Sequence, residues 1–73
     1  MTGKFYRHFK GGKYKVLCVA LDSETQEEMV VYQALYGEGR TWVRPKAMFL
    51  SDVERPGYSG PRFVEITEEE ANA

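Results

Sequence analysis

Side chains that bind anions or stack on flat groups gather in two segments of this 73-residue chain, near residues 7–10 and 42–46. They are Arg7, His8, Lys10, Trp42, Arg44 and Lys46. An arginine fork binds a phosphate or carboxylate through two parallel hydrogen bonds, and an indole ring offers a flat face for stacking. If the fold brings the two segments together, the sequence predicts one basic and aromatic ligand-binding surface.

Positive and negative charges are separated along the chain although they nearly cancel in total. Ten Lys and Arg oppose eleven Asp and Glu, which gives a formal net charge of −1. Residues 1–20 hold five positive and no negative side chains, residues 21–39 hold five negative and no positive ones, and positive charge returns with Arg40, Arg44 and Lys46. A function based on electrostatics would therefore depend on local charge, with nucleic acid or an acidic peptide as the partner.

Two of these candidates have alternative structural roles. The alternation of side chains along a strand places Trp42 and Arg44 on one face and Val43 on the other. We expect Val43 to face the core, which leaves Trp42 at the rim; the alternative is that Trp42 fills the core and Arg44 pairs with a glutamate. His8 would gain a positive charge below about pH 6.5 if exposed, or would hydrogen-bond to the backbone near the edge of the sheet.

Residues for catalysis or metal binding do not form a recognisable set. His8 is the only histidine, and no serine or cysteine lies in a nucleophile motif. Cys18 lies in the most apolar segment and is expected to pack as a small hydrophobic residue. The glycines at 11–12 and 37–39 precede no helix that would aim amides at a phosphate, so they are interpreted as turns. We expect neither an enzyme nor a bound metal or cofactor.

The elements that must position the candidates are mainly strands. Alternating apolar residues and turn residues predict strands over 4–9, 13–21, 28–36, 40–44 and 62–66. Pro45 and the following residues predict one turn of 3-10 helix before the last strand, and the glycines and prolines of 54–61 predict a loop. Residues 1–66 would form one domain, followed by an acidic flexible tail over 67–73.

This order of elements predicts an all-β domain, a small SH3-like barrel of about five antiparallel strands. The nearest alternative is an OB-type barrel. That fold needs a longer helix between its third and fourth strands, and no segment offers ten residues of helical periodicity.

Several fragments of the chain, taken in order, resemble a family of short bacterial proteins, the domain-of-unknown-function family numbered 1653. The fragments are Tyr6-Arg7-His8-Phe9-Lys10-Gly11, Ser23-Glu24-Thr25, Val30-Val31-Tyr32, Leu35-Tyr36-Gly37, Trp42-Val43-Arg44-Pro45 with Met48-Phe49, and Pro61-Arg62-Phe63. The resemblance covers about Tyr6 to Ile66 and implies an SH3-like barrel with no established activity, cofactor or catalytic residue. Many members of that family look as if they have a histidine where this chain has Asp22, so the resemblance leaves His8 without a second histidine.

The function expected from these observations is that of a non-catalytic binding module whose basic and aromatic surface takes an anionic or aromatic partner. The alternative is a protein-interaction domain that acts through an apolar barrel edge. One unpaired cysteine and the absence of a long apolar run favour a cytoplasmic protein with no membrane partner. We expect a monomer or a weak homodimer.

Overall fold

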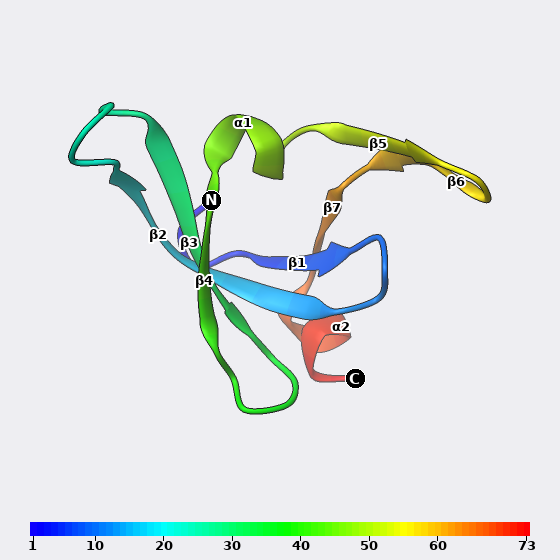
Figure 1. Ribbon diagram of the computed structural model, residues 1–73. Coiled ribbons are helices and arrows are strands. Elements are labelled where there is room, and N and C mark those ends of the chain that lie inside the picture. Colours follow the sequence, from blue (N-terminus) through cyan, green and yellow to red (C-terminus); the bar gives the residue numbers. More distant parts are fainter.

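The protein is a small all-β domain, as the sequence predicts. The computed structural model describes residues 1–73 and contains seven strands and two short helices (Figure 1). In chain order the elements are β1 (Phe5–His8), β2 (Lys13–Leu21), β3 (Glu28–Ala34), β4 (Thr41–Pro45), α1 (Lys46–Phe49), β5 (Asp52–Arg55), β6 (Tyr58–Pro61), β7 (Phe63–Ile66) and α2 (Glu68–Asn72). Neither helix has the length and apolar character needed to cross a membrane.

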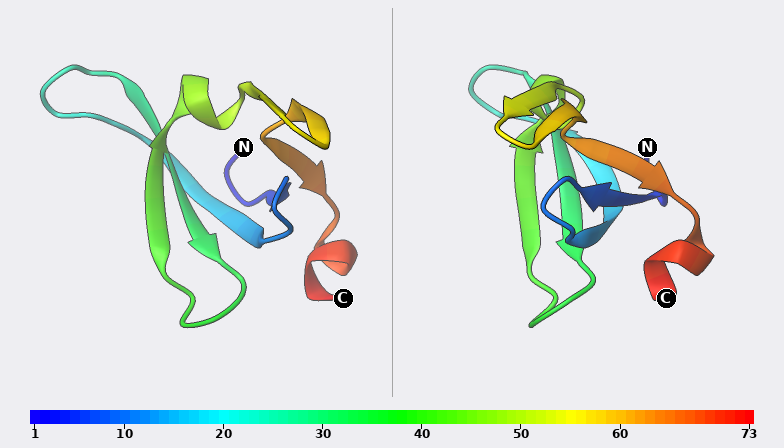
Figure 2. Two further views of the ribbon diagram at one scale, coloured as in Figure 1. Left: turned by 45° about the vertical axis from the view of Figure 1, so that its right-hand side comes forward. Right: turned by 90° about the vertical axis from the view of Figure 1, so that its right-hand side faces the viewer.

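Five strands form one antiparallel sheet in the order β4-β3-β2-β1-β7, and β5 pairs with β6 in a separate hairpin. The pairing of β7 with β1 brings the end of the domain back to its beginning, while β5 and β6 project beside the sheet (Figure 2). Strands β4 and β7 are the two edges of the sheet and are not paired with each other. Closure into an SH3-like barrel stays a prediction.

The two faces of the sheet follow from its register, because residues directly opposite each other on antiparallel strands share a face. The buried residues Val30, Tyr32 and Ala34 of β3 define the inner face. A bulge between Val16 and Cys18 changes the register of β2 against β3, and bulges of this kind bend a strand. As a result Cys18, expected to be packed, is exposed on the outer face.

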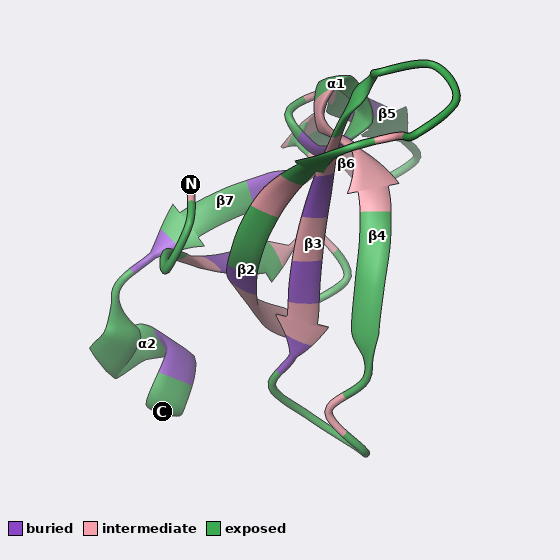
Figure 3. Cartoon of the chain, turned by 90° about the vertical axis from the view of Figure 1, so that its left-hand side faces the viewer, coloured by how far each residue is buried: buried purple, intermediate pink, exposed green.

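An aromatic cluster fills the inner face. The six buried residues of this core are Tyr6, Val16, Val30, Tyr32, Phe49 and Phe63. The rings of Phe49 and Phe63 are stacked with centroids 4.0 Å apart, and Tyr6 meets the Phe49 ring edge-on at 5.1 Å. Figure 3 shows the buried positions of β3 alternating with less buried ones, while β4 is largely exposed.

The helical turn after β4 is α-helical, which corrects the prediction of a 3-10 turn. The N–H of Leu50 donates to the carbonyl of Lys46, four residues earlier, at 3.0 Å, and this spacing is that of an α-helix. The turn buries Phe49 against the core while its neighbour Met48 stays 47% exposed. Its role in the fold is therefore to deliver one aromatic ring.

Residues 54–61, expected to be a loop, contain most of the β5–β6 hairpin. Gly57 has a φ of 88°, and Pro56 precedes it, which are the residues that a type II turn prefers at its two central positions. The hairpin is anchored by Tyr58, whose ring stacks on Phe9 with centroids 5.4 Å apart. Turn-forming residues here connect two short strands instead of forming an irregular loop.

Residues 67–73, expected to be a flexible tail, contain helix α2 with Thr67 and Ala73 as its caps. The Thr67 hydroxyl accepts a hydrogen bond from the Glu70 N–H, and the Glu70 carboxylate accepts one from the Thr67 N–H, both at 3.1 Å. Such a capping box satisfies backbone groups at the start of a helix. Acidic side chains there are also stabilised by the positive end of the helix dipole. Lys13 Nζ donates to the carbonyls of Glu70 and Ala73, and Ala71 is buried. The glutamates therefore begin a helix rather than keep the segment extended.

Candidate basic and aromatic pocket

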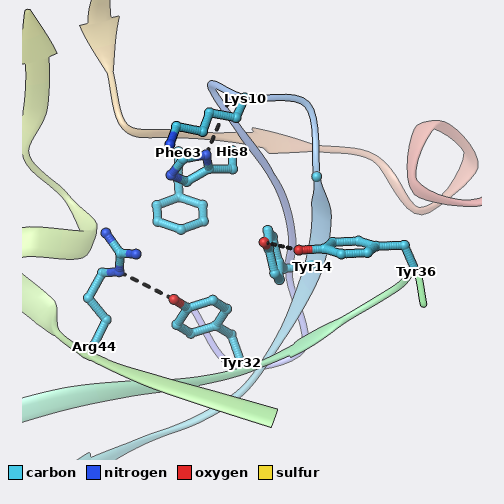
Figure 4. Close-up of a pocket in the computed structure, with 8 residues that line it drawn as sticks. His8, Lys10, Tyr14, Tyr32, Tyr36, Arg44 and Phe63 are labelled. Carbon is cyan, nitrogen blue, oxygen red and sulfur yellow. Dashed lines mark hydrogen bonds between the residues drawn. The ribbon is translucent and has the colours of Figure 1, made fainter. Parts of the chain in front are cut away.

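A pocket of about 410 Å³ opens on the inner face, where β1, β2, β3, β4 and β7 each contribute a side chain (Figure 4). Its lining combines cations with aromatic rings and contains no carboxylate. The residues are His8, Lys10, Gly12, Tyr14, Tyr32, Tyr36, Arg44 and Phe63. We refer to this hollow as the His8–Arg44 pocket.

Arg44 reaches the pocket from the edge strand β4. Its Nε donates to the Tyr32 hydroxyl at 3.2 Å, and its guanidinium carbon lies 5.5 Å from the centre of the Phe63 ring. The ion pairs of the structure are Arg40–Glu38 and Lys46–Glu28, so Arg44 has no carboxylate partner. Its two terminal nitrogens are held in place and free to bind an anion as a fork.

His8 lies beside Arg44 and is electrically neutral at neutral pH. Burial, followed by the positive charge of Arg44 and of other nearby cations, lowers the pKa of His8 from its ordinary value of 6.5. The Lys10 N–H donates to His8 Nδ1 at 3.1 Å; since a neutral imidazole carries one proton, Nε2 holds it and acts as a donor. The structure thus favours the backbone-bonded interpretation of His8 over that of a third cation.

Two tyrosines close the other side of the pocket. The hydroxyls of Tyr14 and Tyr36 form a hydrogen bond of 2.5 Å, and this bond, together with burial as the larger cause, raises the pKa of Tyr14. Gly12 leaves room for the pair, because a Cβ atom at this position would lie 2.9 Å from Tyr36 Cε1 and 3.1 Å from the Tyr14 hydroxyl. Tyr14 therefore remains a neutral phenol that shapes the pocket.

The two predicted segments converge only in part. His8, Lys10 and Arg44 line the pocket, but Arg7 pairs with Lys13 and Val64 on the outer face. Its charge, with that of Lys13, adds to the Thr67 hydrogen bonds that chiefly lower the pKa of Glu70.

Lys46 is also outside the pocket. Its Nζ lies 3.5 Å from a Glu28 carboxylate oxygen, and the residue lines a different hollow with Glu27, Ala47 and Leu50. Lys46 lies outside the pocket because β4 ends at Pro45 and Lys46 begins the helical turn α1.

The orientation of β4 is the reverse of the one expected. Trp42 pairs with Tyr32 and Arg44 with Val30, so both lie on the inner face, whereas Val43 pairs with Val31 on the outer face and is 60% exposed. Trp42 is nevertheless 50% exposed, because edge strand β4 has no further strand to cover it. The alternatives of a core-filling Trp42 and an Arg44 paired with a glutamate are therefore both wrong.

Sequence reasoning missed part of the lining. Tyr32 is buried and Tyr36 is 53% exposed, and neither was among the predicted ligand-binding residues. Phe63 and Gly12 had no functional role in the prediction. The available signal was the alternation of β3, which puts Tyr32 on the same face as Val30 and Ala34; the register that adds Trp42 and Arg44 to this face is seen only in the structure.

Comparisons of the sequence and of the fold with known proteins both match one protein family. The model of the family described as "Protein of unknown function (DUF1653)" matches residues 4–65. The fold is similar to the crystal structure of a protein of that family from Bordetella bronchiseptica, with a TM-score of 0.80 and 30% sequence identity, over 92% of this chain and 88% of that chain. Among curated proteins, none matches this chain.

Proposed function

The chain belongs to the protein family DUF1653, whose function is unknown, and we propose that this member is a non-catalytic binding module that takes an anionic group into the His8–Arg44 pocket. The proposal rests on the environment of the Arg44 guanidinium. Its guanidinium is fixed by Tyr32 and Phe63, lies in a pocket without carboxylates and has no ion-pair partner. An anion would supply the partner that the protein does not.

The remaining donors of the pocket suit the same ligand. The Nε2–H of neutral His8 and the ammonium of Lys10 are hydrogen-bond donors, and Arg55 and Arg62 are near enough to lower the pKa of His8 further. The charged oxygens of phosphate and carboxylate groups accept hydrogen bonds, so they match a set of donors that no protein carboxylate occupies.

The test is an amide chemical-shift titration of the labelled protein with inorganic phosphate and pyrophosphate at low salt. We expect shifts at His8, Lys10 and Arg44, which added salt weakens because the contact is between charges. Arg44→Gln should weaken binding by roughly tenfold or more, the size expected for a lost charge-assisted hydrogen bond.

Arg7→Gln is the matched control, because it removes the same charge from the outer face. It should retain nearly the wild-type affinity. The proposal is wrong if no anion shifts the pocket residues, or if the two arginine variants lose affinity equally.

A second candidate is a protein-interaction domain that acts through the outer face of the sheet and its open edge. The observation that favours it is a row of apolar residues across three strands: exposed Cys18, half-buried Val31 and Val43, which is 60% exposed. The row ends at edge strand β4, whose unpaired backbone groups can accept another strand. This candidate predicts an interaction that depends little on salt.

A further inference from the structure

We propose that the ligand of the pocket is a nucleotide unit, with its phosphate between Arg44, His8 and Lys10 and its base stacked on Trp42 and Tyr36. This inference rests on the proposed anion-binding function and adds the chemical class of the ligand. The same unit occurs in a free nucleotide and in a single-stranded nucleic acid, and both present a phosphate next to a flat aromatic ring.

A second hollow next to the His8–Arg44 pocket provides the place for the base. It has a volume of about 200 Å³ and is lined by Ala34, Tyr36, Gly37, Glu38, Arg40 and Trp42. Tyr36 lines both hollows, so they meet at its ring. A ligand with one anionic and one flat aromatic part fits this pair of adjoining hollows.

The two large aromatic rings of the second hollow are exposed enough for a ligand ring to stack on them. Trp42 is 50% exposed and Tyr36 53% exposed. Trp42 belongs to none of the close ring pairs that hold the core together, whereas Tyr36 meets Tyr14 edge-on at 5.5 Å. An aromatic ring whose face is not covered by the protein is the usual platform for a base of a single strand.

The spacing along β4 matches the two parts of a nucleotide. Trp42 and Arg44 are two residues apart on the same face, which corresponds to about 6.6 Å along a strand. A base and the phosphate of the same nucleotide are separated by one sugar, a distance of this order. An acidic peptide would use Arg44 but would leave Trp42 and Tyr36 uncovered, so the nucleotide accounts for more of the surface.

The chain provides a direct probe, since Trp42 is its single tryptophan. We would titrate the protein with uridine 5′-monophosphate and with an octamer of uridylate, and follow Trp42 fluorescence together with amide shifts. Ribose 5-phosphate, uridine and a hexaglutamate peptide are the comparison ligands. We expect the nucleotide and the octamer to quench Trp42 and shift Arg44, while ribose 5-phosphate shifts Arg44 without quenching.

The same titration distinguishes a free nucleotide from a single-stranded nucleic acid by comparing the affinities for the monophosphate and the octamer. An octamer that binds more tightly than eight equivalents of the monophosphate indicates a single-stranded nucleic acid, and equal affinity per nucleotide indicates a free nucleotide. Either result supports the nucleotide unit. A wild-type response in which hexaglutamate binds as tightly as the octamer and Trp42 is silent overturns it.

Variants of Trp42 supply the matched control. Trp42→Phe keeps a stacking face, and Trp42→Leu keeps apolar area without one. We expect the leucine variant to bind the monophosphate roughly 5- to 150-fold more weakly than wild type, the range for loss of one stacked base, and the phenylalanine variant to lie between them. Circular dichroism confirms that both remain folded.

The outcome also separates the two proposals. If both Trp42 variants bind the monophosphate as tightly as wild type while Arg44→Gln does not, the base contact is wrong and anion binding stands. If ribose 5-phosphate and the monophosphate both leave Arg44 unshifted, anion binding itself fails, and the nucleotide inference fails with it.

Discussion

Arg44 and His8 both lie against the Phe63 ring but contribute to the pocket in different ways. Arg44 carries a permanent charge that Tyr32 orients through a hydrogen bond, whereas His8 is a neutral donor because burial and the neighbouring cations lower its pKa. Because the pKa of His8 is lower in the folded protein than in the unfolded chain, the folding stability depends on pH.

Stability should fall on the acid side of neutrality because of His8. The folded protein binds this proton less readily than the unfolded chain, so stability is retained above the ordinary pKa of 6.5 and is lost as the pH falls towards the lowered pKa of the folded state. His8→Gln cannot titrate and keeps an acceptor for the Lys10 N–H. Urea unfolding between about pH 7 and pH 5 should show a smaller loss in this variant; an unchanged pH dependence would contradict the lowered pKa.

Gly12 should be needed for the paired tyrosines. Gly12→Ala would place its methyl group 2.9 Å from Tyr36 Cε1 and push the ring outward, breaking the Tyr14–Tyr36 hydrogen bond. Because the Tyr36 ring is half exposed and can move, we expect a cost of about 1 kcal/mol, the low end for overpacking. Chemical denaturation and tyrosine proton shifts measure both effects.

A double variant checks the cause. In a Tyr36→Ala background the Gly12→Ala substitution should cost less, since the closer of the two crowding rings is gone and Tyr14 has room to move. If the stability losses of the two single variants simply add in the double variant, the strain of Gly12→Ala does not come from contact with the Tyr36 ring.

At the scale of elements, the short helical turn α1 stabilises the domain through a single side chain. Phe49 is the only buried residue of the turn, and it contacts the rings of Phe63, Tyr6 and Tyr32. The turn also sets the direction in which the chain leaves β4, and β4 carries Trp42 and Arg44. Packing of α1 and the geometry of the pocket are therefore coupled through one short connection.

Removal of the Phe49 ring should be the most damaging change in α1. Phe49→Ala is expected to lower the free energy of unfolding by about 3–5 kcal/mol, as for other buried phenylalanines, and Phe49→Leu by less. Met48→Ala, in the next position but 47% exposed, should stay within about 0.5 kcal/mol of wild type. Thermal unfolding distinguishes them, and equal effects of the two alanine variants would contradict the assigned packing.

The sequence predicted the five strands of the main sheet well, and the β5–β6 hairpin and the two helices poorly, for a physical reason. The expected strand 13–21 coincides with β2 (Lys13–Leu21) because a long alternating apolar run leaves little choice of structure. The missed elements depend on tertiary contacts: the β5–β6 hairpin on the stack of Tyr58 on Phe9, and α2 on Lys13 and the burial of Ala71. Such contacts join residues far apart in the chain, and local patterns do not contain them.

The site was predictable to the same degree. His8, Lys10 and Arg44 were identified by type and converge, but the orientation of β4 was wrong because Val43 is the more apolar residue. Register against β3 decides the face, and Trp42 and Arg44 follow Tyr32 and Val30 to the inner side. Alternation alone leaves two orientations open for a strand at an edge, where neither face is fully covered.

At the scale of the whole molecule, the two faces of the sheet offer different surfaces. The inner face carries the basic and aromatic pocket, and the outer face carries the apolar row of Cys18, Val31 and Val43. The acidic side chains of residues 22–28 lie in and next to the β2–β3 loop, while the cations Arg7 and Lys13 lie on the outer face. Anion binding and any contact between proteins can therefore be changed independently.

Val43→Thr should separate the two surfaces experimentally. The substitution keeps the shape and the strand preference of the residue but removes apolar area from the outer face, where Val43 is 60% exposed. We expect stability within about 0.5 kcal/mol of wild type, unchanged phosphate binding and less self-association in sedimentation at high protein concentration. A large loss of stability would mean that Val43 faces the core after all.

The bulge in β2 also determines how this molecule can be attached to a support. It turns the chain's single cysteine, Cys18, outward on the face opposite the pocket. A maleimide-coated surface would therefore capture every molecule in one orientation, with the pocket facing the solution. Oxidation would join two chains back to back through the same sulfur atoms, giving a bivalent particle whose two pockets point in opposite directions.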